Sequence, residues 1–438
     1  MIGEWFTRSF RSLARWADRV DEATAPPGPV AGAWAVVKLV GLSGTLPLTF
    51  FVYGAVAAHN TRLVDRQLPN YAEFLARVLA NERPEGVAVE RRNGAARYVI
   101  TSDLHRAHPG RSDWPARQGT DRVYRAMLDH YADGDWTLVE NGDVEDLWLA
   151  GGSTYGVVYE LARLAAMALP ERERAAVLAE VYEEHLRRVI ANNRPIYDRI
   201  AEFVDRDAYV RIVGNHDDVW RRPYGRRALA DQLGQSVVDH LVLTGPDAPV
   251  ALINHGHQTD AWNAPGRDRI GKLFTSWGSA LHDLPFVPTS PGMPPPSTTA
   301  ALLGSRAPNR LLAMLPLIGA DLDAQSLDEV KLCQALRDTP VGRVWLVLGH
   351  THVPLKRPTD ATAPPNASPA RYINSGAGIL HRSATAIEWD GAPLDDGGEP
   401  YLRLVAWHDD GDTVRRTELD ADPGDPAVLR AGPEATVG

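Results

Sequence analysis

Residues 141–146 read Asn-Gly-Asp-Val-Glu-Asp, and they follow the apolar run Trp136-Thr137-Leu138-Val139. Such a run is typical of a buried strand, so we expect Asp143 to leave the strand's carboxyl end on a turn that Gly142 permits. Open α/β sheets place their chemistry at these strand ends. A carboxylate there can bridge two divalent cations, provided that other strands deliver ligands to the same edge.

Four further strand-like runs also end in candidate ligands. They lead into Asp103-Leu104-His105, Gly214-Asn215-His216-Asp217, His255-Gly256-His257 and Gly349-His350-Thr351-His352. One such motif in a loop is more often a solvated or capping group than a site. Five motifs, each directly after an apolar run, have no reason to collect at strand ends if they are unrelated surface residues. The pattern therefore predicts one shared site at the edge of a sheet.

The order Asp-X-His, Gly-Asp-X-X-Asp, Gly-Asn-His-Asp, His-Gly-His and Gly-His-X-His, within about residues 97–381, resembles the calcineurin-like metallophosphoesterase superfamily. Within it, the chain looks most similar to the branch that includes UDP-2,3-diacylglucosamine pyrophosphatases. That second resemblance is carried by Gly-Asp-Val-Glu-Asp-Leu-Trp at 142–148, Asn-His-Gly-His-Gln-Thr-Asp at 254–260, Gly-His-Thr-His-Val-Pro at 349–354 and Tyr-Ile-Asn-Ser-Gly at 372–376. Serine/threonine protein phosphatases have Arg and Glu where this chain has Leu147 and Asp217, so it departs from their pattern.

The resemblance implies a centre of two divalent metal ions. One ion would be bound by Asp103, His105, Asp143 and His352, and the other by Asp143, Asn215, His255 and His350. Imidazole, carboxylate and amide oxygen together suit Mn, Fe, Zn or Ni rather than Ca, and the pyrophosphatase branch implies manganese. His257 is the alternative to His255, which we prefer because it lies closer to the strand end.

Two such metals would lower the pKa of a bridging water and hold phosphate oxygens in line for its attack, so no protein nucleophile is required. His216 is placed to face the leaving group as proton donor or charge stabiliser. The resemblance implies that Asp146 orients His216, although Asp146 is equally suited to cap a helix. Arg106, Arg221 and Arg222 lie beside the motifs, either as phosphate-binding groups or as surface charges.

We therefore predict a metal-dependent phosphoric ester or diphosphate hydrolase that acts on a phosphorylated small molecule or a lipid-linked substrate. A nucleotide-linked lipid precursor is one candidate. The alternatives are a cyclic-nucleotide phosphodiesterase, a nuclease, and a non-catalytic scaffold on the same fold. A net charge of -10 over 438 residues argues against a dedicated nucleic-acid partner. The presence of all seven predicted ligands and His216 argues against the scaffold.

Residues 1–93 are expected to be helical and associated with a membrane in an otherwise cytoplasmic protein. Residues 4–20 place large apolar residues at helical spacing with arginines between them, which is typical either of a helix on an anionic membrane surface or of an ordinary packed helix. Residues 39–58 carry no charge and equal the length of a membrane span, but glycines and Pro47 interrupt them. They predict a transmembrane helix, a re-entrant hairpin or a buried helix.

The catalytic domain is predicted over residues 94–410 as an α/β fold of two stacked mixed β-sheets flanked by helices. Helical periodicity predicts an insertion over residues 155–204 that shapes a substrate cleft. A second insertion, over residues 259–320, is rich in aromatic residues, which either hold an acyl chain or a nucleobase or serve only in packing. Residues 411–438 are expected to form a flexible acidic tail. The single cysteine, Cys333, excludes an intramolecular disulfide.

Overall fold

A computed structural model describes residues 2–24, 29–110, 113–148, 152–260, 263–265, 272, 329–352, 354–356, 371–419 and 435–437. The side chains of residues 41–65, 330 and 435–437 are outside that description. The predicted insertion over residues 259–320 lies almost entirely outside the described residues, so its role stays a prediction.

A seven-stranded mixed sheet carries three of the five motifs. Its central strands β2 (Arg97–Thr101), β3 (Trp136–Asn141) and β4 (Tyr209–Ile212) run parallel to one another. The remaining strands pair antiparallel beside β2, in the order β10 (Ser383–Asp390), β11 (Tyr401–Asp409), β12 (Val414–Glu418) and β13 (Ala435–Val437). Because β2, β3 and β4 are parallel, the loops that follow them leave from the same edge of the sheet.

A six-stranded mixed sheet carries the other two motifs. Its order is β1 (Val89–Asn93), β5 (His240–Thr244), β6 (Pro249–Ile253), β7 (Trp345–Leu348), β9 (Tyr372–Ser375) and β8 (Pro354–Lys356). Strands β6, β7 and β9 are parallel, so the motifs after β6 and β7 also leave from one edge.

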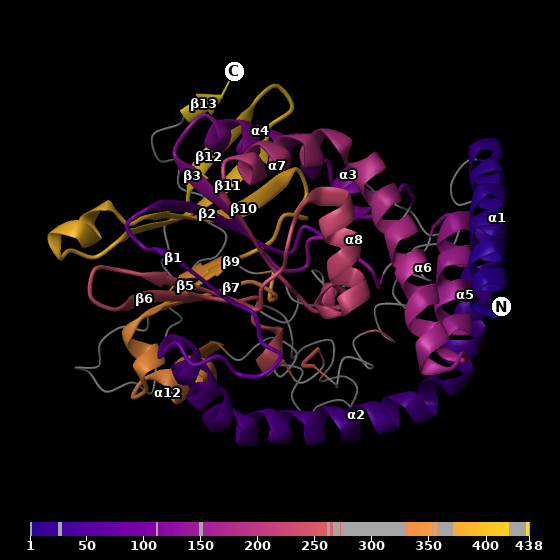
Figure 1. The fold of residues 1–438 in the computed structure, drawn as a ribbon, viewed down its shortest axis with the longest axis horizontal. Coiled ribbons are helices and arrows are strands. Elements are labelled where there is room, and N and C mark those ends of the chain that lie inside the picture. Colours follow the sequence, from indigo (N-terminus) through magenta and orange to yellow (C-terminus); the bar gives the residue numbers. More distant parts are fainter. Residues whose placement is uncertain are drawn as a thin grey trace.

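The two sheets pack face to face, as Figure 1 shows. Along β3, Val139 points into the core shared by the sheets, where it packs with residues such as Ile100 and Ile253. Its neighbour Leu138 points the other way, toward Met127 and the rest of the helical layer. Both faces of these strands are buried, which explains their continuous apolar runs. The predicted α/β fold of two stacked mixed sheets flanked by helices is confirmed.

Helices cover the outer face of each sheet. Over the seven-stranded sheet lie α4 (Thr120–Ala132), preceded by the short α3 (Trp114–Gln118), and α7 (Arg194–Asp205). Over the six-stranded sheet lie α12 (Glu329–Leu336) and the end of the long α2 (Pro29–Leu79). Leu75 of α2 and Leu332 of α12 meet the outward residues of β5, β6 and β7 in a third core.

The predicted insertion over residues 155–204 forms helices α5 (Thr154–Met167), α6 (Glu171–Asn192) and α7, and Pro170 and Pro195 mark their boundaries. Helix α1 (Ile2–Ala23) packs against α5 and α6. After β4, η1 (Asp218–Arg221) leads into α8 (Pro223–Leu233). Of the two predictions for residues 4–20, packing on the protein is confirmed for one helical face, which buries Phe10, Ala14 and Ala17.

The uncharged segment 39–58 is helical throughout, as part of α2. Most of its side chains lie outside the described residues, so the prediction made for it stays open. Within the described part of the chain, no helix is both long and apolar enough to cross a membrane.

The flexible tail was predicted to begin at residue 411, which is too early in the sequence. Residues 414–418 form β12, which pairs antiparallel with β11 along Val405–Asp409 and buries Val414. Val414 and Thr417 are the buried residues of this strand, although the local composition is acidic and rich in glycine. Residues 420–434 lie outside the described residues.

A buried ion pair joins the loop after β3 to β4. The guanidinium of Arg211 contacts the carboxylate of Glu145, and both side chains are fully buried. Glu145 also accepts hydrogen bonds from Tyr197 Oη, at 2.5 Å, and Trp220 Nε1, at 3.0 Å. The charge of Glu145 is therefore compensated only by partners inside the protein.

Replacing Arg211 with Leu should lower the free energy of unfolding by about 3–5 kcal/mol, because it leaves the Glu145 carboxylate buried without its counter-charge. Denaturant unfolding followed by circular dichroism measures this loss. The matched control is Arg194→Leu, which breaks an exposed pair with Asp198 and should cost less than about 1 kcal/mol. Equal losses in the two variants would contradict the structural role given to Arg211.

Candidate metal centre

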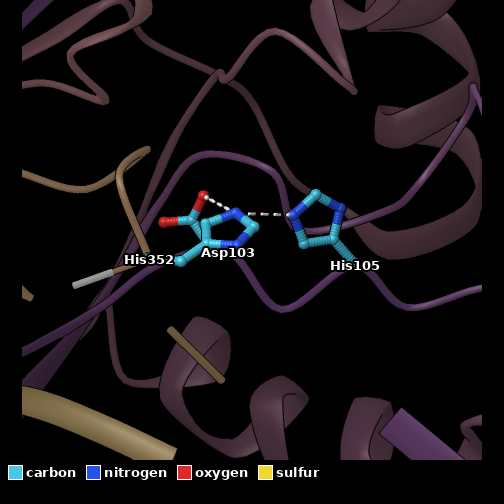
Figure 2. A group of neighbouring side chains, drawn as sticks. All are labelled: Asp103, His105 and His352. Carbon is cyan, nitrogen blue, oxygen red and sulfur yellow. Dashed lines mark hydrogen bonds and ion pairs between the residues drawn. The ribbon is translucent and has the colours of Figure 1, made fainter. Parts of the chain in front are cut away.

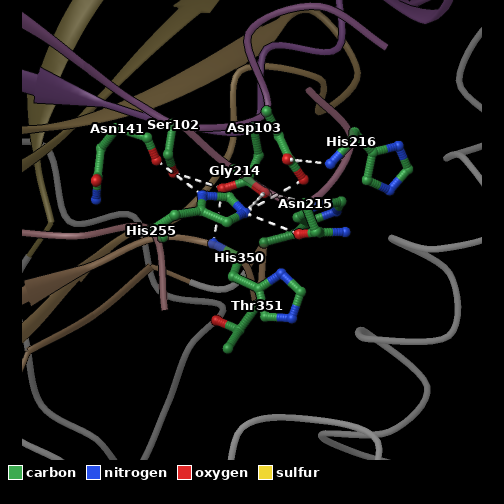
Figure 3. A network of polar contacts seen from close by, with 12 residues as sticks. Ser102, Asp103, Asn141, Gly214, Asn215, His216, His255, His350 and Thr351 are labelled. Atoms are coloured by element: carbon green, nitrogen blue, oxygen red, sulfur yellow. Dashed lines mark hydrogen bonds and ion pairs between the residues drawn. The ribbon is translucent and has the colours of Figure 1, made fainter. Parts of the chain in front are cut away.

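The five motifs meet where the two sheets' strand ends face each other. Figure 3 shows residues from the carboxyl ends of β2, β3, β4, β6 and β7, and from the loops that follow these strands, converging on a single network. Each predicted ligand other than His350 is at most 5% exposed, and His350 is partly exposed. The structure therefore brings together all seven: Asp103, His105, Asp143, Asn215, His255, His350 and His352.

One group of possible metal donors consists of Asp103, His105 and His352 (Figure 2). His352 Nε2 lies 3.1 Å from Asp103 Oδ1 and 3.4 Å from His105 Nε2. Asp143 Oδ2 lies 3.9 Å from His105 Nε2, so Asp143 borders this group. Asp103 Oδ1 is buried and faces the imidazole of His352, with His255 Nε2 3.9 Å away, so this oxygen is directed at the donor atoms of the site.

A second group consists of Asp143, His255 and His350. His255 Nε2 lies 3.2 Å from Asp143 Oδ2 and 3.2 Å from Asn215 Oδ1. Asp143 therefore belongs to the second group and borders the first, and the carboxylate and imidazole donors of both groups could hold metal ions. Between the alternatives, the structure places His255 in this group. The His257 ring lies 5.4 Å from that of His255, outside both donor groups.

The backbone of the site is unusual. Five of the predicted ligands have left-handed backbone conformations, with φ of 54° at Asp103, 46° at His105, 52° at Asp143, 71° at His350 and 59° at His352. Non-glycine residues adopt this region rarely, and each instance costs about 1–3 kcal/mol unless the surroundings enforce it. Such outliers cluster at functional sites, so their coincidence with the donor groups supports a functional centre.

Glycines in the motifs make room for these donors. Gly142 has φ of 86°, and a Cβ there would overlap the ring of His255. A Cβ on Gly214 would overlap the carboxylate of Asp143. The glycines of Gly-Asp and Gly-Asn-His therefore allow the loops after β3, β4 and β6 to approach one another closely.

Asp146 joins the first donor group to His216. Its Oδ1 lies 3.0 Å from His216 Nδ1, and its Oδ2 lies 3.1 Å from His105 Nδ1. The Trp148 ring stacks on the His216 ring at a centroid distance of 4.1 Å. Asp146 also accepts a hydrogen bond from the backbone N–H of Trp148. The predicted orienting contact is present, together with a local backbone bond.

Charges within the site hold the carboxylates ionised. Burial alone would raise the pKa of Asp103, but His352 and His255 lower it to about 2. Burial likewise opposes the charged form of His216, but Asp146 and Asp143 raise its pKa to about 9. The pKa of Asp143 is also held well below its usual range by the nearby imidazoles, against the effect of burial. Ionised carboxylates are the form that binds metal.

Sequence reasoning assigned no role to Asp260. Its Oδ2 lies 2.6 Å from His350 Nε2, which orients the imidazole of a predicted ligand. Asn141 plays a similar part, because its carbonyl oxygen lies 2.8 Å from His255 Nδ1. The sequence offers one signal for this role of Asp260. It ends the His-Gly-His-Gln-Thr-Asp segment, three residues after His257, which belongs to neither donor group.

The arginines considered as phosphate ligands are placed differently. Arg106 is buried against Glu140, so neither alternative considered for it, a phosphate-binding group or a surface charge, is correct. Arg221 forms an ion pair with Asp239 at 2.6 Å. Arg222 is exposed at the start of α8. A short polar sequence beside a motif does not reveal whether an arginine faces the solvent, the core or the site.

No protein-family model matches the chain, and no curated protein matches it. Among solved structures, it is similar to a cold-active protein-tyrosine phosphatase of a psychrophilic Shewanella species. The identity is 13%, the match covers 80% of this chain and 82% of that one, and the TM-score is 0.23. A similarity this slight supports no argument about function.

Gly214→Ala should weaken metal binding by about 10- to 100-fold, because the added methyl group displaces the Asp143 carboxylate without removing a donor. Titration calorimetry with Mn²⁺ measures the change. The control is Gly3→Ala on α1, where the methyl group meets only Val177 at 3.9 Å. Wild-type affinity in Gly214→Ala would contradict the position given to Asp143.

Proposed function

We propose that the protein is a two-metal-dependent phosphoesterase that hydrolyses a phosphodiester or pyrophosphate bond. The observation that carries the proposal is the position of Asp143, which belongs to one donor group and borders the other, beside the hydrogen-bonded pair of Asp146 and His216. The match of these residues to the superfamily's motifs supports the same reaction class.

The donor set fits divalent ions such as Mn, Fe, Zn or Ni, and we propose manganese first. Two carboxylates, four imidazoles and one amide oxygen surround the centre, which is a mixture that these metals accept and calcium does not favour. When bound, two such ions would supply a nucleophilic water and hold the phosphate oxygens for its attack. Asp103, His105, Asp143 and His352 would hold one ion, and Asp143, Asn215, His255 and His350 the other.

His216 is the proposed proton donor to the leaving oxygen. Its Nδ1 is bound to Asp146 Oδ1, so its Nε2 is the atom left to face a substrate. The carboxylates around it raise its pKa to about 9 against the effect of burial, which favours the protonated imidazole at neutral pH. Trp148, stacked on the ring, fixes its orientation and shields one face from water. A donor held in this way contributes about 10²- to 10⁴-fold to the rate.

The substrate class is proposed from the resemblance alone. A nucleotide-linked lipid precursor stands first, and a cyclic nucleotide is the alternative. A nuclease is disfavoured by the net charge of -10. A non-catalytic scaffold is disfavoured because such a protein has no need to keep seven donors together, five of them on strained backbone, beside an oriented imidazole.

These alternatives are distinguished by a hydrolysis assay with protein that is first treated with a chelator and then resupplied with manganese. The substrates are bis-p-nitrophenyl phosphate, p-nitrophenyl phosphate and UDP-2,3-diacylglucosamine. Manganese-dependent cleavage of the lipid nucleotide supports both the reaction class and the substrate. Cleavage of bis-p-nitrophenyl phosphate alone supports the reaction class and returns the substrate to the cyclic nucleotides. If the metal-loaded protein cleaves none of these three compounds and also fails to cleave a cyclic nucleotide, a non-catalytic scaffold is favoured instead.

His216→Ala should retain bound metal and lose turnover by about 10²- to 10⁴-fold, because it removes the proton donor and no ligand. Asp143→Asn should lose both metal and turnover, because it weakens the donor that the two groups share. Elemental analysis of bound metal and the bis-p-nitrophenyl phosphate rate measure the two effects. His381→Ala, at an exposed position, is the matched control. Wild-type turnover in either site variant would refute the assignment.

A further inference from the structure

Large apolar side chains are exposed on one group of helices. In the described part of the chain, ten large hydrophobic residues are exposed, and nine of them lie on α1, α2 and α5. They are Trp5, Leu13, Trp16, Val36, Val37, Val40, Leu161, Leu164 and Met167, and the tenth is Tyr401 on β11. We call the nine the apolar face. Scattered single residues of this kind are ordinary, but a collection on neighbouring helices marks an interaction surface.

The three helices are held together by specific contacts. Asp21 near the end of α1 accepts hydrogen bonds from the backbone N–H groups of Thr154 and Tyr155 at the start of α5. On the other side, Glu160 of α5 accepts from Trp34 Nε1 of α2 at 2.7 Å and pairs with Lys38 Nζ at 3.1 Å. Figure 1 shows α1 and α5 standing together at the side of the molecule away from the sheets.

The exposed positions of α5 and of the start of α2 lack charge. Along residues 161–168 the exposed side chains are Leu161, Leu164, Ala165, Met167 and Ala168. Along residues 30–40 they are Ala33, Val36, Val37 and Val40. The charged groups between these two helices, Lys38 and Glu160, neutralise each other. Leu164 and Met167 expose 63% and 60% of their surfaces, so neither belongs to the packed core.

Helix α1 adds indole rings and arginines to this surface. Trp5 and Trp16 are exposed on it, together with Arg8, Arg11, Arg15 and Arg19. Arg11 pairs with Glu180 of α6, and the exposed acidic residues of α1 are Glu4 and Glu22. The other three arginines therefore leave the exposed charge of α1 positive in a chain whose net charge is -10. The sign of this local charge is therefore opposite to that of the protein as a whole.

We propose that the apolar face docks onto an anionic lipid surface, with α1, the start of α2 and α5 lying along it. Tryptophan and arginine beside aliphatic residues are favoured at the boundary between lipid tails and headgroups. The positive charge of α1 complements anionic headgroups, and the rest of the acidic chain is repelled by them. This docking requires no helix to cross the bilayer, and it is independent of the proposed hydrolysis.

Flotation of the full-length protein with lipid vesicles tests the proposal. The protein should float with phosphatidylcholine vesicles that contain phosphatidylglycerol, and binding should fall on pure phosphatidylcholine and in high salt. The double variant Leu164→Gln, Met167→Gln should bind at least about tenfold more weakly, because two apolar contacts with the lipid are lost. The double variant Arg15→Gln, Arg19→Gln should lose most of the preference for phosphatidylglycerol.

Tyr401→Gln is the matched control, because Tyr401 is exposed to a similar extent but lies outside the apolar face. It should bind vesicles as the wild type does. Circular dichroism and thermal unfolding of each variant confirm that the helices are intact. Wild-type flotation by the Leu164→Gln, Met167→Gln variant, or no flotation of the wild type, overturns the proposal. So does a wild-type dimer in sedimentation that this variant converts to monomer, since the face would then join two copies.

Discussion

The carboxylate of Asp143 is the group on which the rest of the centre depends. Its Oδ1 accepts the backbone N–H of His216 at 2.8 Å, and its Oδ2 faces the imidazoles of His255 and His105. Its carbonyl oxygen accepts the N–H groups of Leu104 and His105. One residue therefore connects the loops after β2, β3, β4 and β6. A methyl group at Gly214 would displace this carboxylate, and one at Gly142 would displace its neighbour His255.

Buried charges beneath the loops keep this arrangement rigid. Arg106 pairs with Glu140, which also accepts from Tyr124 and Tyr209, and Arg211 pairs with Glu145. Buried pairs contribute little net stability, because removing both charges from water costs as much as their attraction returns. Their value lies in geometry, since a mispositioned loop would leave a charge without its partner.

Much of the centre could be predicted from sequence because its signals are local. A strand followed by a glycine and a carboxylate or histidine is a short pattern, and parallel strands bring such patterns to one edge. The role of Asp260 was missed because its partner, His350, is 90 residues away in sequence and belongs to another strand's loop. The burial of Arg106 was missed for the same reason, since Glu140 precedes a different motif.

Two other elements show where sequence patterns fail. Leu161, Leu164 and Met167 follow helical spacing and belong to the periodicity that predicted the insertion over residues 155–204, yet they are exposed. Helix α5 is apolar around most of its circumference, so periodicity cannot say which side is covered. Strand β12 was hidden by acidic and glycine-rich surroundings, and its pairing with β11 depends on a partner that composition does not reveal.

Helix α5 is bonded directly to the loop of the centre. Tyr159 Oη and Arg163 Nη1 both donate hydrogen bonds to the carbonyl oxygen of Leu147, at 3.3 and 2.7 Å. Leu147 follows Asp146 immediately, so a displacement of α5 would pull on the carboxylate that orients both His105 and His216. Helix α5 thus connects the exposed surface on one of its sides to the loop that carries Asp146 on the other. A force on its exposed side would be transmitted to the reactive groups.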